Sequence, residues 1–189
     1  MDPLAGSPWS DPSTVAGFAK SLPNDTLIAF AKHELRPGAR ALDVGCGAGR
    51  NAVPLAEMGW NVTAMDLSWP MIEAAVARAQ HVHVEARVHA VLAPMDRMPI
   101  ADRSMDFLVA HGIWNLARSS AEFRRGVAEA ARVAKPGAAL FVFTFSRHTL
   151  PPDATPIDGE PFVFTQFSGN PQCFLTEAQL VDELRAAGF

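Results

Sequence analysis

The segment DVGCGAGRN, residues 43–51, places three alternate glycines between a short apolar run and an amphipathic segment. Glycine lets a backbone turn tightly and approach a ligand closely, since it carries no Cβ. The run ALDV, residues 41–44, is typical of a buried strand, and residues 52–58 are typical of a helix. The stretch therefore predicts a strand, a ligand-binding loop and a helix.

The same alternation continues along the chain. Further strands are predicted from apolar runs at 62–66, 88–92, 105–110 and 139–144, with a short extra strand at 162–165. Helices are predicted from capping residues and stop signals at 24–35, 68–80, 119–134 and 176–187. This order predicts an α/β fold with a Rossmann-like, doubly wound, mostly parallel sheet flanked by helices. Ligands of such sheets bind beyond the carboxyl ends of the strands.

Composition indicates one globular domain of 189 residues, with 49% hydrophobic and 19% charged residues. We expect a Pro- and Ser-rich N-terminal arm at 1–23 and a single domain at 24–189. The net charge of −4 and the single adjacent basic pair, Arg124-Arg125, argue against nucleic acid as a partner. The two cysteines allow no disulfide framework, and no zinc spacing is present, so no metal is expected. Without a signal-peptide pattern or a membrane-length apolar run, we expect a cytoplasmic protein.

The glycine loop does not match the dinucleotide fingerprint. G-x-G-x-x-G would need glycine or alanine at position 50, where Arg50 stands. Asp43 would repel phosphates and suits a cationic or amine-bearing ligand instead. Asp43 followed by Gly45-x-Gly47-x-Gly49 resembles motif I of the class I S-adenosylmethionine-dependent methyltransferases.

The resemblance extends over roughly 41–145. Asp66 ends the next strand, where this family places the carboxylate that binds both ribose hydroxyls. Residues 95–109 are similar to the family's D-x-x-x-L-P-F-x-D-x-S-F-D-x-V, although this chain has two fewer residues between Asp96 and Pro99. Residues 131–137 are similar to R-V-L-K-P-G-G. The loop is most like the small-molecule branch that includes tellurite-resistance and thiol methyltransferases.

The resemblance implies S-adenosyl-L-methionine as cofactor, S-adenosyl-L-homocysteine as product and a small-molecule methyl acceptor. It implies in-line displacement onto a sulfur, oxygen or nitrogen atom. Asp96 would accept a hydrogen bond from the adenine amino group, and Met95 would pack on the ring. The residues expected to bind the cofactor are Asp43, Gly45, Cys46, Gly47, Gly49, Arg50, Asp66, Leu67, Met71, Met95, Asp96 and His111.

The loops after the fourth and fifth strands carry candidates that include Trp114 and Asn115, and the residues selected as candidates for catalysis are His111, Arg147 and His148. A solvated or wall-forming role is an equal alternative for each. An acceptor pocket lined by aromatic residues, or simple packing, is expected of Phe162, Phe164, Phe167 and Phe174, with Trp9, Val15 and Phe18 of the arm. The run Phe141 to Phe145 is predicted to be core. A non-catalytic S-adenosyl-binding module and an NAD-dependent oxidoreductase are the rival functions, and Arg50 and Asp43 argue against the second.

The family's sheet normally has seven strands, and we expect this chain to lack strands six and seven. Strand 139–144 would then be an edge strand with unpaired backbone groups. Two arrangements would protect it. The segment 162–167 could fold back along it as an antiparallel strand, or two chains could pair through it as a homodimer.

Overall fold

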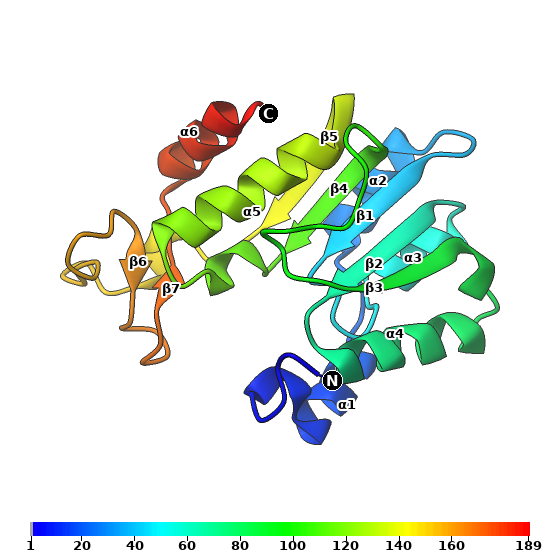
Figure 1. The fold of residues 1–189 in the computed structure, drawn as a ribbon, viewed down its shortest axis with the longest axis horizontal. Helices are drawn as coiled ribbons and strands as arrows, with labels where there is room; N and C mark the ends of the chain where they lie inside the picture. Colours follow the sequence, from blue (N-terminus) through cyan, green and yellow to red (C-terminus); the bar gives the residue numbers. More distant parts are fainter. Residues whose placement is uncertain (1) are drawn as a thin grey trace.

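A five-stranded sheet forms the centre of the computed structural model, which describes residues 2–189 (Figure 1). Its strands are β1 (Arg40–Val44), β2 (Asn61–Asp66), β3 (Val88–Leu92), β4 (Met105–His111) and β5 (Ala134–Phe143). The spatial order is β3-β2-β1-β4-β5, and every neighbouring pair is parallel. The predicted doubly wound parallel sheet is confirmed. Its topological switch point, where chain order reverses, lies between β1 and β4.

Six α-helices among residues 2–189 surround this sheet. They are α1 (Pro12–Ala19), α2 (Asp25–Glu34), α3 (Ala52–Glu57), α4 (Trp69–His81), α5 (Ser120–Val133) and α6 (Glu177–Ala187). Of these, α2, α3, α4 and α5 pack on the two faces of the sheet, while α1 packs on α4 and α6 on α5. Successive side chains of a strand point to opposite faces. Leu42 and Val44 of β1 therefore pack in the core beneath α5, whereas Ala41 packs with α2, α3 and α4. Figure 1 shows α5 lying across β4 and β5.

The C-terminal part differs from the sequence-based expectation. A short strand, β6 (Val163–Phe164), does form where one is predicted, but it pairs antiparallel with an unpredicted strand, β7 (Gln172–Cys173). The two make a separate small sheet, so the expectation that 162–167 lines the edge of β5 is wrong. Val163 and Phe164 are buried in the core on the α5 side, and this burial keeps β6 away from the edge of β5.

The phenylalanines around the end of β5 are another correction. The apolar pattern predicts that Phe141 to Phe145 are core, yet Phe143 and Phe145 are 42% and 38% exposed. Both lie where β5 leaves the body of the sheet, and on its outer side β5 has no neighbouring strand among residues 2–189. Their exposure is therefore a consequence of strand position, which the apolar pattern alone does not report.

The N-terminal arm folds against α4. Asp2 accepts a hydrogen bond from the Trp69 backbone N–H at 3.1 Å, and Ser68 Oγ donates to the Trp9 carbonyl at 3.0 Å. At the other end of α1, Arg78 of α4 donates to the carbonyls of Ala19 and Ser21. The arm is thus attached to α4 before and after α1. No helix among residues 2–189 has the length and apolar character to cross a membrane.

Candidate functional site

The glycine loop joins β1 to α3 at the switch point. Gly45, Gly47 and Gly49 all have positive φ, at 70°, 52° and 75°, a conformation that is costly for residues with a Cβ. The backbone N–H groups of Gly45 and Cys46 both donate to the Met65 carbonyl, at 2.8 and 2.9 Å. These contacts tie the loop to the end of β2. The loop therefore has one defined shape before any ligand is considered.

Asp43 lies beneath this loop at the end of β1. It is only 1% exposed, and neither carboxylate oxygen has a hydrogen-bond partner among the described residues. Burial, and then the negative charge of Asp66, raise the pKa of Asp43 to about 7, while a weaker contact with the Ala52 backbone N–H and the charge of Arg50 act in the opposite direction. A buried acid without a protein partner is expensive to ionise. Its position fits a cationic ligand that would supply the missing positive charge.

Asp66 ends β2 on the opposite side of the loop. One of its oxygens accepts from the Gly47 N–H and the other from the Ser68 N–H, each at 2.9 Å. Burial raises the pKa of Asp66 above its ordinary value, while these backbone hydrogen bonds act in the opposite direction. An ionised carboxylate has about four acceptor sites. Asp66 therefore retains capacity for the two hydroxyls of a ribose.

A polar cluster surrounds His111 at the end of β4. Its Nε2 lies 3.2 Å from the Asn24 amide nitrogen and 3.5 Å from an Arg50 guanidinium nitrogen. Both partners are donors, so Nε2 accepts and the ring proton is assigned to Nδ1. Burial, and then the charge of Arg50, lower the pKa of His111 below its ordinary value. The imidazole is therefore neutral near pH 7.

Asn24 and Asn51 belong to this cluster, although neither is among the predicted site residues. The sequence predicts only a cap of α2 for Asn24, and Asn24 does cap it by accepting from the Leu27 N–H at 2.9 Å. Its own N–H donates to the buried side chain of Asn51 at 3.1 Å. Asn51 directly follows Arg50 at the end of the glycine-rich stretch, and this position could have indicated that it belongs to the site. Nothing in the local sequence around Asn24 indicates that its amide reaches His111.

The arm lies directly on the glycine loop. A Cβ at position 47 would stand 3.1 Å from the Phe18 ring of α1 and 3.9 Å from the sulfur of Met71. A Cβ at position 45 would collide with Ile113 at 2.7 Å. Phe18 and Ile113 thus pack over the loop from the arm and from the segment after β4. A ligand lying on Gly47 must share this space with Phe18.

Met95 and Asp96 lie on the segment between β3 and β4. Asp96 forms an ion pair with Arg125 of α5 at 3.1 Å, and the Met95 side chain lies close to Gly126. The contact with Arg125 uses one carboxylate oxygen of Asp96, and its other oxygen forms no ion pair or hydrogen bond to a described residue. The segment between β3 and β4 thus contacts α5 through these two residues.

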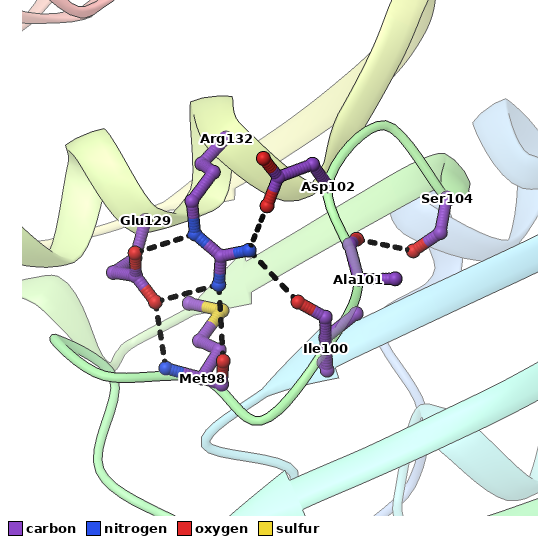
Figure 2. Close-up of polar contacts among 7 residues, drawn as sticks. All are labelled: Met98, Ile100, Ala101, Asp102, Ser104, Glu129 and Arg132. Atoms are coloured by element: carbon purple, nitrogen blue, oxygen red, sulfur yellow. Dashed lines mark hydrogen bonds and ion pairs between the residues drawn. The ribbon is translucent and has the colours of Figure 1, made fainter.

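Arg132 of α5 holds the following part of this segment (Figure 2). Its guanidinium donates to the carbonyls of Met98 and Ile100, and it pairs with the carboxylates of Asp102 and Glu129. Glu129 also accepts from the Met98 N–H at 2.7 Å. This network holds residues 98–102 against the last turn of α5, just before the chain enters β4.

Three other predicted site residues have side chains with different roles. The Cys46 thiol packs in the core and donates to the Gly47 carbonyl, and burial followed by the charge of Asp43 raises its pKa well above the ordinary value. The Arg147 guanidinium donates to the carbonyls of Pro151, Pro152 and Ala154. It therefore organises the proline-rich segment. His148 is exposed.

The aromatic residues predicted to line an acceptor pocket also have different positions in the structure. Phe162, Phe164 and Phe174 are buried in the core, so packing accounts for them. Phe167 is 49% exposed, and Phe18 lies on the glycine loop. Leu67 directly follows Asp66 and is half-buried at the same edge of the sheet.

This site and fold define a ligand-binding α/β domain, and comparison with known proteins identifies its family. Residues 42–142 match the methyltransferase domain family. Demethylmenaquinone methyltransferase of Corynebacterium urealyticum is 30% identical over 172 residues, which are 82% of this chain and 70% of that protein. A ubiquinone/menaquinone biosynthesis C-methyltransferase of Geotalea daltonii is 31% identical over 123 residues, covering 63% of this chain and 51% of that protein. The chain belongs to the class I S-adenosylmethionine-dependent methyltransferase family, whose cofactor is S-adenosylmethionine.

Solved structures agree on the fold. A SAM-dependent methyltransferase from Methanosarcina mazei superposes with a TM-score of 0.72 at 24% identity, covering 88% of this chain and 85% of that one. The [4+2]-cyclase SpnF superposes with a TM-score of 0.69 at 26% identity, covering 87% of this chain and 57% of that one. The chain spans 60% of the length of a second curated relative, from Renibacterium salmoninarum. The names of these relatives do not include a tellurite-resistance or thiol methyltransferase, so that finer placement stays a prediction.

Proposed function

We propose that this chain binds S-adenosylmethionine beyond the carboxyl ends of β1, β2 and β4 and transfers its methyl group to a small-molecule acceptor. The observation that carries the proposal is Asp43, a buried carboxylate beneath the glycine loop that has no hydrogen bond of good geometry and forms no ion pair with a described residue. An unpaired buried charge costs several kcal/mol, roughly 3–5, when its partner is missing. The sulfonium and ammonium groups of this cofactor are positive charges of the kind that the position lacks.

The remaining contacts are inferred from the chemistry of each residue. Asp66 would accept from both ribose hydroxyls, since its carboxylate is not saturated by the two backbone N–H groups. Arg50, whose buried Nε has no partner among the described residues, would hold the carboxylate of the methionine part. Leu67 and Met95 would flank the adenine, and the uncommitted oxygen of Asp96 would accept from its amino group.

The alternate glycines and Met71 complete this arrangement. Gly45, Gly47 and Gly49 keep the loop in its positive-φ shape, and a Cβ at any of them would meet neighbouring protein atoms within 3.2 Å. The Met71 sulfur lies 3.9 Å from the position of a Cβ on Gly47, and from there it would contact the cofactor. Cys46 would contribute its backbone, because its thiol is directed into the core.

The reaction then requires the acceptor to be placed correctly and, for a hydroxyl acceptor, one proton to be removed. When bound, the cofactor supplies an electrophilic methyl group on a good leaving group. The chain's task is to hold an acceptor in line with that methyl in a site from which water is excluded, as the packing of Phe18 and Ile113 over the loop favours. His111 keeps Nε2 unprotonated near neutral pH. An acceptor hydroxyl that replaced the Asn24 amide could pass its proton to that atom.

The acceptor is a small organic molecule in this proposal. The names of the curated relatives support it, since those proteins are named for demethylmenaquinone and for the C-methylation of ubiquinone and menaquinone. Carbon therefore joins sulfur, oxygen and nitrogen as an acceptor atom to be tested. One solved relative is named a cyclase, so methyl transfer itself has to be measured separately from cofactor binding.

The test is isothermal calorimetry with S-adenosylhomocysteine on the wild-type chain and on Asp66→Ala. We expect binding to the wild type and a loss of roughly 2–4 kcal/mol in the variant, because two charge-assisted hydrogen bonds to the ribose disappear. Asp153→Ala, an exposed carboxylate remote from the loop, is the matched control and should bind as the wild type does. Binding of NAD without binding of S-adenosylhomocysteine would reject the proposal. Binding without methyl transfer to any acceptor would favour the non-catalytic alternative.

A further inference from the structure

Three exposed phenylalanines form one surface beside the candidate site. Phe143, Phe145 and Phe167, here called the phenylalanine platform, are 42%, 38% and 49% exposed. Phe143 ends β5, Phe145 follows it, and Phe167 lies in the turn between β6 and β7. Segments far apart in the sequence thus place three rings together. Large apolar side chains that stay exposed as a contiguous group mark binding surfaces.

The platform is supported from below. The rings of Phe145 and Phe167 are 5.4 Å apart, and those of Phe143 and Phe145 are 6.3 Å apart. The fully buried Phe174 lies 6.5 Å from Phe145 and 5.5 Å from Phe167. Because Phe174 is held in the core, the two rings above it have a fixed base. The platform therefore offers aromatic surface without the ordering cost of a mobile loop.

His111 connects the platform to the cofactor side of the molecule. Its ring stacks on Phe143 with the centroids 4.4 Å apart and the planes 11° apart, and its Nε2 contacts Asn24 and Arg50. The His111 side chain thus contacts both the phenylalanine platform and the polar cluster of Asn24 and Arg50. His111 and Phe143 end β4 and β5, and ligands of such sheets bind beyond the carboxyl ends of the strands.

We infer that the methyl acceptor is a planar aromatic compound that stacks on the phenylalanine platform, with its reacting atom directed toward His111. Aromatic rings gain an offset-stacked or edge-to-face interaction beyond their buried area, which an alkyl chain or an aliphatic thiol does not. The Arg147 guanidinium nearby is already bonded to three carbonyls and stacks over Phe164, so it adds no free charge that would select an anion. The inference rests on the proposed function, since it names the substrate class of the same site.

The experiment compares two ligands that share a carbon skeleton. Binding of 1-naphthol, which is planar and aromatic, and of 1-decalol, its saturated counterpart, is measured by calorimetry with and without saturating S-adenosylhomocysteine. We expect the wild-type chain to bind 1-naphthol about fivefold more tightly or better, as one to two aromatic contacts predict. Phe145→Leu and Phe167→Leu should each remove most of that preference while leaving the affinity for S-adenosylhomocysteine unchanged.

Phe30→Leu is the matched control, because Phe30 is also 38% exposed but packs on Phe107 and Phe141. Equal affinity for the two ligands, or unchanged preference in both platform variants, would overturn the inference. So would a platform that joins two copies of the chain, seen in sedimentation as a dimer lost in Phe145→Leu without any 1-naphthol binding. If S-adenosylhomocysteine fails to bind, the proposed function fails, and the measurements without it still report on the platform.

Discussion

At the residue scale, the two acids of the site are placed in different environments by the same loop. Asp66 accepts two backbone hydrogen bonds, whereas Asp43 accepts none of comparable geometry. Burial is the largest influence on the pKa of both acids, but fewer backbone hydrogen bonds oppose it at Asp43, whose pKa is raised to about 7. The charge state of Asp43 therefore changes within the physiological pH range, and cofactor binding should respond to it.

The first residue-scale prediction concerns Asp43→Asn. The folded pKa of Asp43 exceeds its ordinary value of 3.8, so the folded state binds the proton more tightly than the unfolded state does. Asp43 thus lowers stability progressively as pH rises from about 4 to about 7, and fully above that. Without ligand, Asp43→Asn should therefore raise Tm relative to the wild type at pH 8, with the difference vanishing near pH 4. Asp158→Asn, an exposed acid, controls for net charge. A difference independent of pH would contradict this account.

At the element scale, α1 is attached to the sheet domain through few contacts, and one of them covers the glycine loop. Its ends are held by Ser68 and Arg78 of α4, and between them Phe18 packs on Gly47. The helix buries none of its residues completely. An element with few buried apolar contacts belongs to the least stable part of a structure. We therefore expect the arm to be the part of the site that moves when the cofactor enters.

Phe18→Ala tests this role of α1. Removing the ring uncovers Gly47, so S-adenosylhomocysteine should associate faster, by about two- to tenfold, a range within what variants of one interface show. Stopped-flow fluorescence of the nearby Trp9 and Trp69 measures the rate. Leu22→Ala, at the end of the same arm and 81% exposed, should leave it unchanged. A slower association in Phe18→Ala would show that the ring guides the ligand instead of competing with it.

At the scale of the whole molecule, β5 is the edge of the sheet. Only β4 pairs with it among residues 2–189, and the small sheet of β6 and β7 lies elsewhere. Its residues stay half-exposed instead of buried, unlike those of the central strand β1. An edge strand with free N–H and C=O groups is a template for another strand. Pairing of two chains through β5 therefore stays a prediction of this structure.

Sedimentation velocity over a range of concentrations tests that pairing. We expect the wild type to associate reversibly, and Ala138→Lys to shift the equilibrium toward monomer, because a lysine on an edge strand opposes pairing. Circular dichroism should show the variant folded. Leu22→Ala, on the N-terminal arm and 81% exposed, should not alter the equilibrium. A wild type that stays monomeric at every concentration would reject pairing through β5.

The sequence alone determines the framework of the protein: strand, glycine loop, helix, and the acids that end two neighbouring strands. These features are local, since hydrophobic period, capping residues and glycines act within a few positions of each other. The sheet and the family are therefore predicted correctly, down to the capping box at Thr176 and the left-handed Gly188 that ends α6. The short strand β7 and the start of β5 at Ala134 are not, because long-range pairing decided both.

Only the tertiary structure decided which side chains meet in the site. The Asn24 amide contacts His111, which is 87 positions away in the sequence. Phe18 contacts Gly47 from an N-terminal arm that the sequence predicts to lie outside the domain. Conversely, Arg147 has the right place in the chain for a catalytic residue, yet three carbonyls of its own segment take its donors. Contacts between side chains that are far apart in the sequence depend on how the helices and strands pack. That packing is determined by the burial of apolar surface in the whole core. The rings of Phe143 and Phe145 are exposed for the same reason, since an apolar run has the same pattern whether its strand is central or at the edge.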